Sequence, residues 1–244
     1  MSLRVTGAVA RRVLEQLRRD PRTIALILAL PCVLVVLLQQ LFGRHSPVFQ
    51  RIGTPLLGLF PFITMFLVTS ITMLRERTSG TLERLMTMPL GKIDILAGYA
   101  IAFALLAVVQ AVLVSVLTFG LLGLDVVGPK WVIVALAVLN ALLGTTLGLS
   151  VSAFAQTEFQ AVQFMPAIVF PQIFLCGLLV PRDQMAGWLE AISWALPLTY
   201  AYDALARTAA DQLDGRFALD VAIVCGCIVL AVALGAASLR RRTD

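Results

Sequence analysis

Six long runs of residues without a charged side chain divide this sequence. Each run is 19 to 30 residues long and is bounded by Arg, Lys, Asp or Glu. A helix needs roughly 20 apolar residues to cross the hydrocarbon core of a bilayer. Because an extended chain could not satisfy its backbone polar groups in lipid, such runs predict membrane-spanning helices. The runs are Thr23–Gly43, Ile52–Leu74, Ile95–Leu124, Trp131–Thr157, Phe159–Pro181 and Val221–Leu239.

The composition supports the same interpretation. The chain of 244 residues is 59% hydrophobic and 14% charged, whereas soluble globular chains carry about 25% charged residues. So few charges cannot cover a surface that faces water, which excludes a disordered chain and most soluble enzymes. We therefore predict an all-α integral membrane protein, a single transmembrane domain over residues 1–244. Its six transmembrane helices are expected at 23–43, 52–74, 96–124, 131–155, 159–180 and 218–239.

The basic residues predict the orientation of the chain. With six spans, the arm 1–22, the loop 75–95 and the C-terminal tail lie on one side, and they contain thirteen Lys and Arg residues against six on the other side. Cytoplasmic loops carry the excess of Lys and Arg. We therefore expect both termini to be cytoplasmic. Because the basic residues flank spans, we expect no nucleic-acid partner.

The N-terminal arm, residues 1–22, has the pattern of a basic amphipathic helix. At about 100° per residue, the opposite sides of such a helix carry arginine and aliphatic residues. A helix of this kind is suited to the membrane interface, and Asp20-Pro21 ends it. It could be a topology anchor on anionic lipid, or an elbow that also contacts a cytoplasmic partner. The basic side holds Arg4, Arg11, Arg12, Arg18 and Arg19 together with Glu15, and the other side holds Val5, Val9, Val13, Leu14 and Leu17.

The loop 75–95 predicts a second short helix. Ser79 and Gly80 can cap a helix start, Glu83 would lie in the favourable first turn, and Pro89 would end the helix. Two turns are marginal alone in water, so the helix needs a surface to lie on. It is either a connector on the bilayer or a docking helix for a soluble protein. The mixture of acidic and basic residues favours docking.

Residues 181–206 predict a pair of short helices on the outer side. The uncharged run from Ala191 to Tyr202 is too short to span. Trp188 and Trp194 suit the membrane interface, and Pro181 and Pro197 interrupt the helices. The segment is either an interfacial hairpin that dips back into the outer leaflet or a lid over an exit path.

The sequence carries no motif for catalysis. The P-loop, nucleophile-elbow and H-E-x-x-H patterns do not occur in it, so we expect no catalytic residue, no metal site and no ATP hydrolysis by this chain. Intramembrane acids or histidines, which proton-driven carriers need, are nearly absent from the runs. A membrane-embedded enzyme is disfavoured for the same reason. Transport by this chain would therefore need an external motor.

Uncharged polar residues do occur in the predicted spans. Thr69 lies in the second span, and Gln163 and Gln172 lie in the fifth. Such groups either join helices by hydrogen bonds or line a substrate path. The fifth span has the stronger claim to a path, because Pro166 and Pro171 free backbone carbonyls that need protein or cavity partners.

Two strings resemble the ABC-2 type permeases. The first is Glu76–Leu85 (ERTSGTLERL), followed by Pro89, and the second is Phe174–Pro181 (FLCGLLVP), followed by Trp188-Leu189, Leu196–Tyr200 (LPLTY) and Asp203-Ala204-Leu205. The resemblance covers nearly the whole chain. The nearest branch is that of the bacterial drug-resistance, daunorubicin-type exporters.

The resemblance implies a permease subunit of an ATP-binding cassette exporter, built like the ABCG-type transporters, in the bacterial cytoplasmic membrane. Two permeases, as a homodimer or with a related permease, would pair with two separate ATPase subunits. These would bind ATP and Mg, and this chain would hold no cofactor. The expected substrate is an amphipathic drug or lipid-like molecule, and membrane lipids are expected partners. The alternatives are a permease for glycolipid or polysaccharide export and a non-transporting anchor for an ATPase.

The resemblance also implies roles for named residues. Residues 79–88 would form the coupling helix in a groove of the ATPase, the arm would be the connecting helix beside it, and spans two and five would line the path. The coupling candidates are Arg75, Glu76, Arg77, Thr81, Leu82, Glu83, Arg84, Leu85 and Met86, with Arg11, Arg12 and Glu15 from the arm. The translocation-path candidates are Phe66, Thr69, Gln163, Phe164, Phe170 and Gln172. The extracellular gate candidates are Pro181, Trp188, Trp194, Pro197 and Tyr200.

Overall fold

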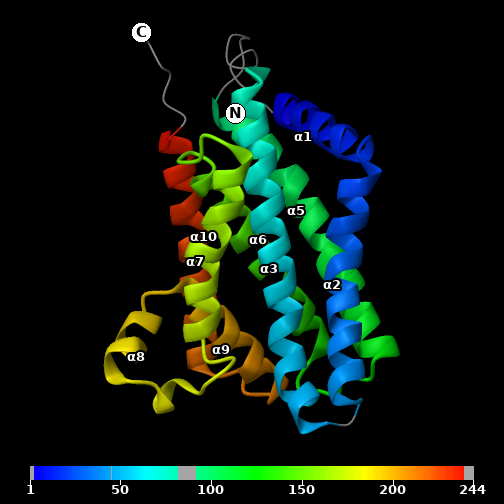
Figure 1. Cartoon of the computed structure of the whole chain (residues 1–244), viewed down its shortest axis with the longest axis vertical. Helices are drawn as coiled ribbons and strands as arrows, with labels where there is room; N and C mark the ends of the chain where they lie inside the picture. The colour runs from blue at the N-terminus through cyan, green and yellow to red at the C-terminus, as the bar shows by residue number, and fades with distance from the viewer. Residues whose placement is uncertain (1–2, 45, 82–91, 239–244) are drawn as a thin grey trace.

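The computed structural model describes residues 3–44, 46–81 and 92–238. All regular elements in these ranges are helices, as the predicted all-α class requires. Figure 1 shows the long helices running alongside one another as a bundle. The elements are α1 (Leu3–Arg18), α2 (Pro21–Phe42), α3 (Pro47–Thr78), α5 (Lys92–Val116), the π-helical η1 (Leu117–Leu121), α6 (Lys130–Val151), α7 (Glu158–Leu175), the 3-10 turn η2 (Arg182–Gln184), α8 (Gly187–Ser193), α9 (Pro197–Ala209) and α10 (Gly215–Ser238).

Five helices in the described ranges are long and apolar enough to cross a membrane: α2, α3, α5 with η1, α6 and α10. The chain is therefore a multi-pass membrane protein. The sixth predicted span corresponds to α7, which has 18 residues and contains two prolines. Its three glutamines lower its hydropathy, so it is not among the five. It packs against α3 within the bundle, and the count of six spans stays a prediction that depends on it.

Several helix ends differ from the predicted ones because caps and turns lie outside the charge-free runs. The expected span 52–74 is part of the longer α3, which begins at Pro47. Ser46 caps the start of this helix, because its hydroxyl accepts a hydrogen bond from the Val48 amide at 3.2 Å. The helix also continues through the first four residues of the expected loop 75–95. The span 159–180 ends early, at Leu175, because Gly177 adopts a φ of +102°.

The arm 1–22 is two elements in the structure. The Asp20 carboxylate accepts hydrogen bonds from the Thr23 amide at 3.2 Å and from the Thr23 hydroxyl at 2.6 Å. This cap, with Pro21 as the first helical residue, starts α2 and separates it from α1. The remaining ends shift by a few residues: α5 with η1 ends at Leu121, α6 at Val151 and α9 at Ala209, while α10 starts at Gly215.

The apolar side of α1 is covered by protein. Val9, Val13 and Leu17 are at most 8% exposed and belong to a core cluster that includes Tyr99 and Phe103 of α5. The hydrophobic effect that would draw an isolated amphipathic helix into lipid is therefore satisfied by α5. What remains exposed on α1 is its arginine side, with Arg4, Arg11 and Arg18.

The centre of the bundle is a close contact between α3 and α6. A Cβ atom placed on Gly144 would lie 2.2 Å from the Phe62 carbonyl oxygen, and one on Gly148 would lie 2.5 Å from the Phe66 carbonyl oxygen. The two glycines are four residues apart on one face of α6, which is the small-residue spacing that lets membrane helices approach closely. This contact fixes α3 at the middle of the molecule.

The two ends of the bundle are different. α1 and the last turns of α10 lie at one end, called here the α1 end, and α8 and α9 lie at the opposite end, called the α9 end (Figure 1). Having both of these elements at one end agrees with an even number of crossings. That the α1 end faces the cytoplasm stays a prediction from the arginine count.

Candidate coupling and translocation sites

A buried ion pair joins α1 to the last turns of α3. The Arg12 guanidinium lies 3.4 Å from the Glu76 carboxylate, whose side chain is 3% exposed. An unpaired carboxylate at this depth would cost free energy, because burial removes its hydration. Arg12 therefore compensates the charge of Glu76 and ties α1 to α3. We call this contact the inner joint.

α5 completes the inner joint. The Thr6 hydroxyl donates a hydrogen bond to the Asp94 carboxylate at 3.4 Å, and both residues are buried. A Cβ on Gly98 would lie 2.6 Å from Val9, so the backbone of α5 can approach α1 only because this residue is glycine. A displacement of α1 therefore acts on α3 and α5 together.

The last turn of α3 also contacts α7. Arg75 forms a two-pronged ion pair with Glu158, with nitrogen–oxygen distances of 2.7 and 2.9 Å. Both side chains are more than half exposed, so water weakens the pair. Arg77 is half-buried in the same turn, and the Thr81 hydroxyl lies 2.7 Å from that of Ser79.

The structure brings some of the coupling candidates together. Arg12 and Glu76 form the inner joint, and Arg75 and Arg77 lie in the same turn of α3. Arg11 and Glu15 pair with each other at 2.8 Å on the exposed side of α1. The candidates Leu82, Glu83, Arg84, Leu85 and Met86 lie outside the described residues, so the coupling helix 79–88 stays a prediction.

The structure does not bring all six translocation-path candidates together. Phe66 and Thr69 are fully buried inside the bundle and face no open surface there. Gln172 is buried, and both polar groups of its side chain form hydrogen bonds within the protein. The side-chain amide donates to the Ile168 carbonyl at 3.0 Å, and the side-chain oxygen accepts from the Leu198 backbone amide at 3.4 Å. Phe170 is 41% exposed on the surface of α7.

Gln163 and Phe164 line one surface hollow near the start of α7. The hollow has a volume of about 360 Å³. The side-chain oxygen of Gln160 accepts a hydrogen bond from the backbone amide of Gln156 at 2.8 Å, and Gln160 is exposed. Sequence reasoning missed Phe154 and Gln156, although the repeat of glutamine at 156, 160 and 163 follows helical spacing. The full lining is Phe154, Gln156, Gln160, Gln163, Phe164 and Ala167.

The gate candidates lie at the α9 end. Pro181 precedes η2, and Pro197 is the first residue of α9. The Tyr200 hydroxyl donates a hydrogen bond to the Trp194 carbonyl at 2.6 Å, and the two rings are 6.1 Å apart. Trp188 is separate from them, 67% exposed on α8. The structure therefore brings Trp194 and Tyr200 together and leaves Trp188 outside their contact.

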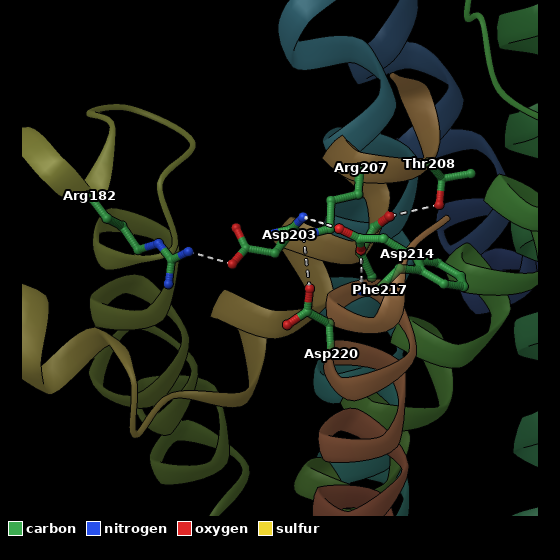
Figure 2. Close-up of polar contacts among 8 residues, drawn as sticks. Arg182, Asp203, Arg207, Thr208, Asp214, Phe217 and Asp220 are labelled. Atoms are coloured by element: carbon green, nitrogen blue, oxygen red, sulfur yellow. Dashed lines mark hydrogen bonds and ion pairs between the residues drawn. The ribbon is translucent and has the colours of Figure 1, made fainter. Parts of the chain in front are cut away.

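Two groups of ion pairs lie at the same end of the bundle, and sequence reasoning missed them. Arg182 pairs with Asp203, and Arg207 lies 3.5 Å from Asp214 and 3.3 Å from Asp220 (Figure 2). Burial raises the pKa of Asp203 to about 6. The available signal was the spacing of Asp203 and Arg207 on one face of a helix. Nothing in the sequence pairs Arg182 with Asp203, 21 residues away.

The charged contacts at both ends of the bundle join one helix or segment to another. In the described ranges, no three His, Cys, Asp or Glu side chains come together as metal ligands. The charged contacts instead link helices: α1 to α3, α3 to α7, and α9 to α10 and to the linker before α8. They therefore offer points through which movement at one end can reach the helices of the bundle.

Comparison with known proteins places these features in a family. The family model described as "ABC-2 type transporter" matches residues 4–208. The probable multidrug ABC transporter permease YbhR of Escherichia coli is 28% identical over 148 residues, 61% of this chain and 40% of that protein. The linearmycin resistance permease protein LnrN of Bacillus subtilis is 27% identical over 176 residues, 72% of this chain and 44% of that protein. The chain thus matches less than half the length of these two relatives. The putative transport permease ycf38 of Cyanophora paradoxa is 27% identical over 80% of this chain and 70% of that protein.

Proposed function

Because the chain belongs to the ABC-2 type transporter family, as its two motif strings predicted, we propose that it is the membrane-spanning permease subunit of an ATP-binding cassette exporter. It moves amphipathic drugs or lipid-like molecules out across the bacterial cytoplasmic membrane. The names of two relatives, a probable multidrug permease and a linearmycin resistance permease, support this substrate class.

The motor in this proposal is a separate ATPase that binds ATP and Mg. Its two copies dock on the α1 end, at the arm and the segment 79–88. The observation that carries the proposal is the inner joint. Its Arg12–Glu76 ion pair joins α1 to α3 a few residues before the segment 79–88. A push from the ATPase on either element therefore reaches α3, and α3 contacts α6 and α7 along the bundle.

The proposal also includes a second permease, either another copy of this chain or a related one. The hollow that Gln163 and Phe164 line is open on the surface of α7. Unpaired amide groups are unfavourable against lipid, so a second subunit facing α7 gives them a protein or water-filled surrounding. The path would then run between two permeases, with α7 on its wall.

The test is reconstitution of the complex. The chain is co-expressed with the products of its neighbouring open reading frames, purified in mild detergent and weighed by native mass spectrometry. We expect a mass of two permeases and two ATPases. In proteoliposomes the complex should drive ATP-dependent movement of an amphipathic fluorescent dye. An ATPase whose P-loop lysine is replaced serves as the control, which should assemble but not transport.

The two alternative functions, a glycolipid or polysaccharide permease and a non-transporting anchor, predict different outcomes of this reconstitution. A complex that assembles and hydrolyses ATP but moves only a glycolipid or polysaccharide probe would replace the drug exporter with the polymer or glycolipid permease. A stable complex that moves no probe at all would support the anchor. A chain that purifies without any ATPase would overturn the proposal.

A further inference from the structure

A surface groove lies between the last turns of α5 and the start of α6. Its volume is about 320 Å³. It belongs to the α9 end, because the connection after η1 reaches α9, where the Val127 amide donates to the Ala209 carbonyl at 3.1 Å. Ser115 is the one polar side chain of the lining and is only 1% exposed, so the accessible wall is apolar. The lining is Val112, Ser115, Val116, Phe119, Gly120 and Val134.

The π-helical η1 shapes one wall of this groove. The Leu122 amide donates to the Leu117 carbonyl at 3.1 Å, five residues back instead of the four of an α-helix. Gly120 lies in this wider turn and has no side chain. A Cβ placed on it would meet nothing within 4 Å. Position 120 therefore leaves open space that a larger residue would fill.

The groove continues an apolar face of a spanning helix. Val109, Val112 and Val116 follow helical spacing on α5, and each is at least 40% exposed. α5 with η1 is one of the five helices long and apolar enough to cross a membrane. Acyl chains satisfy such a face, because it needs no hydrogen-bonding partner.

A lysine lies over the end of the groove. Lys130 is the first residue of α6, one turn before Val134, and its ammonium nitrogen is 5.4 Å from the centre of the Phe119 ring. The side chain is exposed, and none of the ion pairs between described residues includes it. A positive charge without an acidic partner is therefore held beside an apolar wall.

The acidic residue nearest to Lys130 in the sequence, Asp125, is held beside another cation. The Gln50 side chain joins its backbone to that of Arg44, because the Gln50 amide donates to the Arg44 carbonyl at 3.0 Å and the Gln50 oxygen accepts from the Asp125 amide at 2.9 Å. The neighbouring charges of Arg44 and Asp125 offset each other. Lys130 therefore leaves this end of the groove with a net positive charge.

We propose that the groove binds one acyl chain of a bilayer phospholipid whose anionic headgroup lies against Lys130. The chain covers the apolar wall, and the ammonium attracts the negative headgroup. Trp131, next to Lys130, is 74% exposed and suits the boundary between headgroups and acyl chains. The lysine lies at the end of the bundle and the apolar wall lies deeper, which is the order of headgroup and chain in a lipid.

The other occupant of an exposed helix face is a second permease subunit. The hollow on α7 offers the glutamines that a protein or water-filled surrounding would satisfy, whereas the accessible wall of the groove on α5 is apolar. Lipid is sufficient here, and the lysine adds selectivity for the headgroup. This inference goes beyond the proposed function and needs only the membrane-spanning chain.

The experiment measures which lipid lies beside Trp131. Trp188 and Trp194 are replaced by phenylalanine, which leaves Trp131 as the one tryptophan of the chain. The full chain is reconstituted in phosphatidylcholine vesicles in which a minor fraction of the lipid has brominated acyl chains, which quench tryptophan fluorescence on contact. The brominated lipid is phosphatidylglycerol in one series and phosphatidylcholine in the other. We expect the quenching to give a roughly fivefold preference for phosphatidylglycerol.

Four variants test the two parts of the site. Lys130→Gln should lower the preference to about 1, and Lys130→Arg should keep it, because the charge remains. Gly120→Leu fills the groove and should also abolish the preference, although Lys130 is still present. Arg216→Gln removes an exposed charge at the same end of the bundle, at the start of α10, and should leave the preference unchanged.

Gly226→Leu is the matched control for Gly120→Leu, since it adds the same side chain to open space on α10, and it too should leave the preference unchanged. The Tm in detergent checks that each variant folds. Equal quenching by the two lipids in the parent, or a preference that survives Lys130→Gln or Gly120→Leu, would overturn the site. Weak quenching by both lipids would show that protein covers this face and would overturn it as well. No ATPase or transported substrate takes part, so failure of the exporter proposal would leave this result standing.

Discussion

Glu76 shows how one buried residue can stabilise the contact between two helices. Its carboxylate is enclosed between α1 and α3, with Arg12 as the charged partner. Replacing Arg12 by methionine keeps the length of the side chain and leaves Glu76 without a counter-charge. Since Arg12 is 36% exposed, we expect a loss of about 1–2 kcal/mol, less than for a fully buried pair, seen as a lower Tm in detergent.

The adjacent Arg11 provides the matched control. It is 82% exposed and pairs only with Glu15, so Arg11→Met should change stability by less than about 0.5 kcal/mol. Combining Arg12→Met with Glu76→Gln should recover most of the Tm but not ATP-driven transport, because the tie between α1 and α3 stays cut. Normal transport by that double variant would argue against the inner joint as a coupling element.

At the scale of the helices, the contact between α3 and α6 depends on two glycines. A methyl group at Gly148 would lie 2.5 Å from the Phe66 carbonyl oxygen, so the helices must separate. We expect Gly148→Ala to cost about 1–3 kcal/mol, measured as the free energy of unfolding in a denaturing detergent. Gly226→Ala on α10 meets nothing within 4 Å and should be neutral or stabilising by up to about 1 kcal/mol. Equal effects of both substitutions would contradict the close contact.

The helices themselves were readable from the sequence, whereas their partners were not. Charge-free runs locate spans because a charged side chain in the bilayer has a high free-energy cost of desolvation. Five of the runs coincide with long apolar helices. The spacing of Gly144 and Gly148 is typical of a helix that packs closely against another helix. Only the fold shows that the other helix is α3. The same holds for the sites. Of the path candidates, Gln163 and Phe164 line the hollow, while Phe66 and Thr69 are buried inside the bundle. Which side of a helix is covered depends on neighbours far along the chain, so the sequence could not separate these candidates.

On the scale of the whole molecule, the ion pairs between the described residues lie at the two ends. The inner joint and the Arg75–Glu158 pair lie at the α1 end, and the Arg182–Asp203 pair and the two ion pairs of Arg207 lie at the α9 end. Between them the described helices are joined by apolar packing and by hydrogen bonds of uncharged groups, such as that from the Gln110 amide to the Ile27 carbonyl at 2.9 Å. In the described residues, charged and apolar contacts are therefore separated along the length of the bundle.

The surface of α7 predicts where a second permease binds. Gln163 is exposed on a helix that otherwise lies in an apolar bundle, and unpaired amides are unfavourable in lipid. We expect Gln163→Cys, in a chain whose four cysteines are replaced by alanine, to form a disulfide between two copies in native membranes under mild oxidation. Leu230→Cys is the matched control, since Leu230 is 60% exposed on α10 and an apolar side chain there is satisfied by lipid. Crosslinking through position 230 and not through position 163 would indicate that the interface between the two copies lies on α10. The hollow on α7 would then face lipid, and α7 would not line a path between two permeases.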